Sequence, residues 1–224
     1  MSVSTSVPTS VQVTRLPSGL TVATDTMPDA ATVSLGAWVG AGTRQETPEV
    51  NGIAHLLEHM AFKGTERRSA QDIAVEIEAV GGHLNAYTSR ENTAFYAKVL
   101  SEDAPLALDI IADILQHSTF LEEELERERA VVLQEIGQAY DTPDDIVFDH
   151  FQETAYPDQA LGRPVLGESR TVSALKRESL WDYLRGHYGP EQTVVAAAGQ
   201  VEHARFVDMV AGAFTHEGFQ CNGA

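Results

Sequence analysis

The sequence predicts an α+β fold in two layers, with a six-stranded, mainly antiparallel sheet packed against helices. Short β-prone segments occur as two hairpin patterns and two single segments, and long amphipathic segments separate them. The 224 residues are 43% hydrophobic, which is enough to form a sizeable core. We therefore expect one globular domain over 11–215, with a flexible start at 1–10 and a tail at 216–224.

Two hairpins are expected from alternating apolar and polar residues on either side of a turn. The first covers 11–16 and 20–24 around Pro17-Ser18-Gly19. The second covers 83–89 and 93–100 around a polar turn. Together they supply four of the six strands.

Two single strands complete the predicted sheet. Residues 31–39 form an apolar run of small and β-prone residues that ends at Gly40-Ala41-Gly42. This run predicts a central strand buried on both faces. A short buried strand is predicted at 193–198, after the break at Gly189-Pro190.

Helices are expected where apolar residues recur at helical spacing between capping and stop signals. Ser69 starts a capping box, Pro105 opens a helix, and Ser173 is expected to cap another. Residues 156–167 are expected to form an irregular loop. The predicted helices cover 53–62, 70–80, 105–116, 121–140, 144–155, 175–188 and 202–214.

The charge and the cysteine content disfavour several classes of protein. The formal charge of −18 disfavours nucleic acid and anionic membranes and favours cationic partners or peptides, with plain solubility as an equal alternative. One cysteine, Cys221, excludes an intramolecular disulfide framework. The first eight residues have no targeting pattern, and no apolar run is long enough to span a membrane. We expect a reducing compartment, namely the bacterial cytoplasm or, alternatively, the mitochondrial matrix.

His55, Glu58 and His59 stand within five residues in the pattern His-x-x-Glu-His. In a helix, His55 and His59 lie at i and i+4 on one face, so both imidazoles can reach one ion. A catalytic zinc ion usually has three protein ligands, so a third must come from elsewhere. Glu58 can lean over the ion and act as general base on the attacking water. The alternative is an exposed amphipathic helix whose histidines contact only solvent.

Glu135 is the candidate for the third ligand. It shares a helix face with Glu128, seven residues earlier, whereas most of the glutamates at 122–126 are expected to face solvent. Glu135 stands among Val131, Val132, Leu133 and Ile136, where an unpaired carboxylate would be costly. It therefore needs a partner, and a metal ion is one.

At this point the chain resembles the M16 metallopeptidases, zinc peptidases with the inverted motif. The resemblance covers about residues 11 to 215, and Glu135 follows His59 by 76 residues, as the family spacing requires. The blocks that carry it are 51–65, 81–88 with Glu91, Thr93 and Tyr96, 128–136, 141–145 and 162–167.

The resemblance implies a LuxS/MPP-like metallohydrolase fold and a zinc site. His55, His59 and Glu135 would ligate Zn²⁺, and Glu58 would be the general base. The activity implied is that of a zinc metalloendopeptidase acting on extended peptides, with basic peptides favoured by the charge alone.

Two further roles are implied by the resemblance. Glu128 would orient the site without binding the metal, with an ion pair to Arg127 or Arg129 as the alternative. An exposed strand would pair with the peptide substrate, and its alternative is an ordinary edge strand. The implied substrate residues are Leu84, Asn85, Ala86 and Tyr87.

The resemblance also raises the question of partners, because M16 proteins carry a second homologous half that this chain does not include. We expect exposed apolar surface and an oligomer, formed with further copies or with a complementary M16 half-domain. The chain could be a fragment, a natural half-subunit or a truncated product. The alternative function is that of a non-catalytic M16-fold binding or scaffold subunit.

Overall fold

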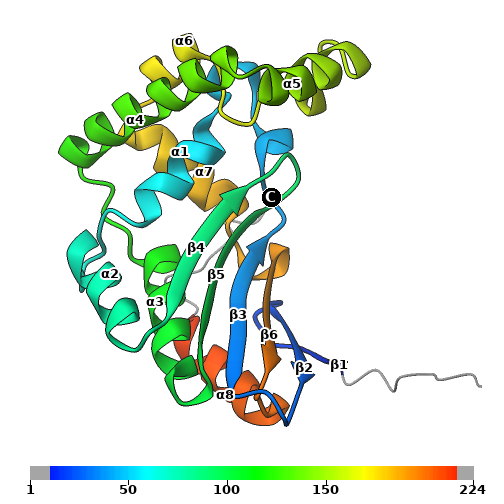
Figure 1. The fold of residues 1–224 in the computed structure, drawn as a ribbon, viewed down its shortest axis with the longest axis vertical. Coiled ribbons are helices and arrows are strands. Elements are labelled where there is room, and N and C mark those ends of the chain that lie inside the picture. Colours follow the sequence, from blue (N-terminus) through cyan, green and yellow to red (C-terminus); the bar gives the residue numbers. More distant parts are fainter. Residues whose placement is uncertain (1–10, 216–224) are drawn as a thin grey trace, which may run out of the picture.

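The computed structural model describes residues 11–215. The expected flexible start at 1–10 and the tail at 216–224, which includes Cys221, lie outside the described residues. Within 11–215 the predicted two-layer α+β fold is confirmed, with one six-stranded sheet and helices packed against it (Figure 1).

The sheet has the strand order β1-β2-β6-β3-β5-β4. Both predicted hairpins are present: β1 pairs antiparallel with β2, and β4 pairs antiparallel with β5. The two single strands, β3 and β6, pair antiparallel in the middle, and among the strands within 11–215 only β2 and β6 run parallel. The strands are β1 (Val11–Arg15), β2 (Thr21–Thr26), β3 (Thr32–Val39), β4 (His83–Thr88), β5 (Thr93–Leu100) and β6 (Thr193–Gly199).

The prediction that residues 31–39 are buried on both faces is wrong. Val33, Leu35, Ala37 and Val39 are buried in the core, but Ser34 on the opposite face is exposed. Ser34 lies beside Lys98 of β5 and Ala198 of β6 in the sheet. At Gly36, on the same face as Ser34, the missing side chain reflects a close approach of β5, since a Cβ there would lie 2.7 Å from the Phe95 carbonyl oxygen.

The helices lie on one side of the sheet and beyond one end of it (Figure 1). Contacts join α3 to β3 and β5, α8 to β2, and α1 to β4, α4 and α7. The α-helices are α1 (Ile53–Ala61), α2 (Ala70–Ala79), α3 (Ala104–Gln116), α4 (Glu122–Asp141), α5 (Pro143–Ala155), α6 (Ser169–Ala174), α7 (Arg177–His187) and α8 (His203–Ala213). None of the helices within 11–215 is both long and apolar enough to cross a bilayer.

The region before α7 differs from the prediction. Ser173 does not cap a helix at 175: it lies inside the short helix α6, and α7 starts at Arg177 after Lys176. Leu175 between them has an extended backbone, and its side chain is buried. The expected loop at 156–167 contains one short 3-10 helix, Ala160–Gly162.

Candidate metal centre

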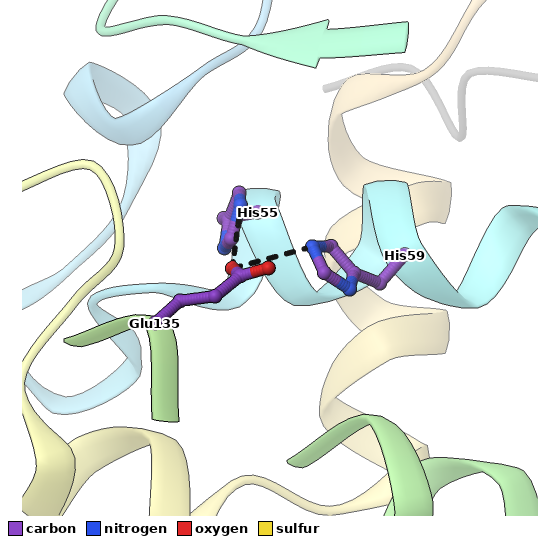
Figure 2. Close-up of side chains that lie close together, drawn as sticks. All are labelled: His55, His59 and Glu135. Atoms are coloured by element: carbon purple, nitrogen blue, oxygen red, sulfur yellow. Dashed lines mark ion pairs between the residues drawn. The ribbon is translucent and has the colours of Figure 1, made fainter. Parts of the chain in front are cut away.

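Helix α1 presents its two histidines on the side away from the core. Ile53, Leu56, Leu57 and Met60 are all buried, as the sequence predicted, so this apolar face fixes the rotation of the helix. His55 and His59, one turn apart, then face α4 (Figure 2). Their rings meet edge to face with centroids 4.6 Å apart.

Glu135 of α4 points at both histidines (Figure 2). Its Oε2 atom is 3.7 Å from His55 Nε2 and 3.6 Å from His59 Nε2. These separations are long for hydrogen bonds. Two ligands of a tetrahedral zinc ion, each about 2.1 Å from the metal, lie about 3.4 Å apart. The three side chains, whose ligand atoms all lie within 4.8 Å of one another, therefore fit around one ion.

The burial of the two glutamates on α4 reverses the expectation. Glu135 was expected to be the costly buried carboxylate, but 36% of its side chain is exposed, compared with 9% for Glu128. Val132 and Ile136 are buried on the adjoining stripe of the helix, while Val131 is exposed. Glu135 thus borders the apolar stripe and opens toward solvent, which leaves access to the site.

His55 is held in the neutral form that binds metals. Burial, with a smaller contribution from His59, lowers the pKa of His55 to about 4, so its imidazole is neutral at pH 7. His59 donates a hydrogen bond from Nδ1 to Glu128 Oε2 at 3.0 Å, which leaves its Nε2 facing Glu135. For His55 Nδ1, the described residues supply no hydrogen-bond partner.

Glu58 is tied to the edge strand of the sheet. Thr88, the last residue of β4, donates a hydrogen bond from Oγ1 to Glu58 Oε2 at 2.5 Å. Burial raises the pKa of Glu58, against the opposing effect of this hydrogen bond. A carboxylate that is partly desolvated and has a raised pKa is a better proton acceptor than an exposed one. The sequence showed Thr88 only as part of a motif block, without this contact.

Glu128 contacts neither Arg127 nor Arg129, the partners of the alternative prediction. Its carboxylate lies between His59 and Lys63, with Oε1 at 2.7 Å from Lys63 Nζ. Burial acts to raise the pKa of Glu128, but the hydrogen bonds with Lys63 and His59 hold it below its ordinary value. The alternative of an ion pair with Arg127 or Arg129 is wrong, since those side chains pair with other glutamates and with backbone carbonyls.

The predicted substrate segment lies on the outer strand of the sheet. β4 has β5 as its partner on one side and forms the end of the strand order. Leu84 and Ala86 are half-buried toward α1 and α2, whereas Asn85 and Tyr87 are exposed. An open strand edge next to Glu58 is the geometry that added-strand binding of a peptide requires.

The start of α1 is held by contacts between two of the blocks that carry the family resemblance, 51–65 and 162–167. Gly52 at the N-cap has φ +96, and a Cβ there would lie 2.8 Å from the Leu166 carbonyl oxygen. Asn51 donates to the Pro164 carbonyl at 3.1 Å and accepts from Thr171 Oγ1 at 2.8 Å. The 162–167 block therefore supports the metal helix from outside the site.

Glu46 caps α1 from six residues before Gly52. Its buried carboxylate accepts hydrogen bonds from Gly52 N and Ala54 N, both at 2.9 Å, and from Asn51 Nδ2 at 2.8 Å. Nearby, Arg163 hydrogen-bonds the Glu46 carbonyl. Burial outweighs these interactions and raises the pKa of Glu46 to about 7. In the sequence, Glu46 stands in a polar stretch, and no pattern there predicted that it caps α1.

We expect Glu46→Gln to remove a pH dependence of stability. Because the folded-state pKa lies above the ordinary value, the folded chain holds this proton to higher pH than the unfolded chain. The free energy of unfolding should therefore fall by roughly 2 kcal/mol as pH rises from 5 to 8, and this fall should largely vanish in Glu46→Gln. Urea unfolding at both pH values measures it, with the exposed Glu66→Gln as control. An unchanged pH dependence in Glu46→Gln would contradict the prediction.

Comparison with known proteins places this geometry in a family. The family described as insulinase, peptidase family M16, matches residues 21–169, which is more than half of the chain. The matched range includes every predicted site residue, from His55 to Glu135.

Two individual relatives support the same family assignment. An uncharacterized zinc protease of Streptomyces coelicolor is 47% identical over 208 residues, which are 93% of this chain and 45% of that protein. The mitochondrial-processing peptidase subunit beta of Homo sapiens is 48% identical over 198 residues, which are 88% of this chain and 40% of that protein. The chain thus spans less than half the length of these relatives.

Solved structures share the fold of this chain. The crystal structure of a protease from Helicobacter pylori superposes with a TM-score of 0.90 at 22% identity, over 96% of this chain and 52% of that one. A structure described as a peptidase M16 inactive domain from Pseudomonas fluorescens superposes with a TM-score of 0.84 at 17% identity, over 91% of this chain and 50% of that one. The chain belongs to the M16 family of peptidases.

Proposed function

We propose that this chain is the zinc-binding part of a metalloendopeptidase that hydrolyses extended peptides. The observation that carries the proposal is the convergence of His55 Nε2, His59 Nε2 and Glu135 Oε2 at separations suited to one tetrahedral ion. Zinc held there would act as a Lewis acid on the peptide carbonyl and lower the pKa of the attacking water.

Each nearby side chain has a defined part in this proposal. Glu58 accepts the proton of the attacking water and returns it to the leaving amine. Thr88 fixes one oxygen of Glu58 and leaves the other free to take the proton. Glu128 holds His59 through Nδ1, as outer carboxylates commonly do for metal-binding histidines.

The substrate would bind along the open edge of β4. Backbone groups of Leu84, Asn85, Ala86 and Tyr87 would pair with an extended peptide, and Thr88 at the end of the same strand contacts Glu58. Strand pairing would therefore bring the scissile bond beside the general base. The net charge of −18 favours basic peptides.

We propose that full activity needs a partner, either further copies of the chain or a complementary M16 half-domain. Exposed apolar side chains support this: Phe148 and Phe151 of α5 are 70% and 63% exposed, and α5 has no buried residue. The relatives from H. sapiens and S. coelicolor are more than twice as long as the matched segment. A reducing compartment, the bacterial cytoplasm or the mitochondrial matrix, remains our proposal for location.

The test is cleavage of a quenched fluorescent peptide by the zinc-loaded chain, alone and with a second M16 half-domain, together with light scattering. We expect a mass above 24.3 kDa at micromolar concentration and faster cleavage with the half-domain. Basic peptides should be cut faster than acidic ones of equal length. A monomer would contradict the association. Zinc binding without cleavage under any condition would favour the alternative function, a non-catalytic binding or scaffold subunit.

A further inference from the structure

Lys63 links the end of α1 to α4 beside the metal centre. It follows His59 by four residues and lies just beyond the helix C-cap, Phe62. Its Nζ atom is 2.7 Å from Glu128 Oε1, and Glu128 Oε2 is 3.0 Å from His59 Nδ1. The three side chains therefore form a row from ammonium to carboxylate to imidazole.

Both oxygens of Glu128 have a partner in this row, so its carboxylate has one preferred orientation. Only 9% of the Glu128 side chain is exposed, so water can replace a lost partner only in part. Three carboxylates, those of Glu58, Glu128 and Glu135, surround the two histidines. The ammonium of Lys63 contacts one of them, Glu128. Loss of Lys63 would leave a buried anion free to rotate away from His59.

We propose that Lys63 is a positioning residue for zinc binding: its ammonium fixes Glu128, which holds His59 with its Nδ1–H toward the carboxylate and Nε2 toward Glu135. The inference rests on the proposed zinc site. Outer partners of metal-binding histidines typically change metal affinity by about 10–100-fold. A lysine that only tied two helices together would affect stability without changing the tautomer of His59.

The test measures zinc affinity by competition with a chromophoric chelator at one pH. We expect Lys63→Met to weaken zinc binding about 10-fold and Lys63→Arg, which keeps the cation, to retain most of the affinity. The exposed Lys98→Met on β5 is the matched control and should bind as the wild type does. Thermal unfolding of the metal-free variants checks folding, and Lys63→Gln replaces Lys63→Met if the latter unfolds.

Two further readouts separate positioning from general stability. In a Glu128→Gln background, Lys63→Met should cause no further loss of zinc affinity, because the two residues act through one contact. Nitrogen NMR of the imidazoles should show His59 with its proton on Nδ1 in the wild type and a mixture of tautomers in Lys63→Met.

Lys63→Met with wild-type zinc affinity would overturn the role of Lys63 and leave the zinc site standing. If Lys63→Met weakened zinc binding as much in the Glu128→Gln background as in the wild-type background, the role of Lys63 would also be overturned. A wild type that binds no zinc would instead overturn the proposed function, and this inference with it.

Discussion

Glu58→Gln should keep zinc and lose peptide cleavage. Glutamine has nearly the same shape and can still accept the hydrogen bond from Thr88 Oγ1, but its amide cannot take a proton. Since general base catalysis contributes about 10²–10⁴-fold, we expect cleavage to fall by at least 100-fold. Zinc content by mass spectrometry and the rate on a quenched fluorescent peptide are measured on the same sample.

The control for this variant is Glu66→Gln, which removes the charge of an exposed glutamate. It should cleave as the wild type does. A Glu58→Gln protein that retains zinc and the wild-type rate would exclude Glu58 as the base. If the wild type and Glu58→Gln are equally inactive even with a second half-domain, the alternative function, a non-catalytic binding or scaffold subunit, gains support.

Glu135→Ala should lose most of the zinc, because two histidines alone make an incomplete site. We expect zinc affinity to fall by more than about 100-fold, beyond the usual cost of losing an outer partner. With 36% of its side chain exposed, Glu135 contributes little to packing, so the fold of the metal-free variant should persist. Chelator competition gives the affinity, and circular dichroism gives the fold.

Glu122→Ala, at the exposed start of the same helix, is the control for Glu135→Ala. A second comparison is Glu128→Gln, whose loss should be smaller because it acts through His59. If Glu135→Ala bound zinc as tightly as the wild type, the third ligand would have to be another residue.

Much of the fold could be predicted because each strand and helix carries its own local signal. The two hairpins follow from alternation around a turn, and the apolar face of α1 follows from Ile53, Leu56, Leu57 and Met60. The parallel pairing of β2 with β6 joins residues more than 170 positions apart, so no local pattern could reveal it. Local patterns could not reveal the exposed face of β3 at Ser34 either, because it depends on where the helices pack.

The site was predictable where spacing fixes geometry. His55 and His59 share a face by helical periodicity, and the family pattern indicated Glu135. The contacts that support these residues were not predictable, because they come from three different segments. Glu46 caps the start of α1, Lys63 contacts Glu128, and Thr88 contacts Glu58. The burial of Glu128 rather than Glu135 likewise depends on how α4 rotates against α1. These are tertiary effects that an isolated segment does not encode.

The most direct measurement is the zinc content of the wild-type chain purified without chelator. We predict one zinc ion per chain, removed by a chelator and lost in Glu135→Ala. A wild-type protein that contains no zinc and takes up none when it is supplied would contradict the metal centre of His55, His59 and Glu135, and with it the proposed peptidase chemistry.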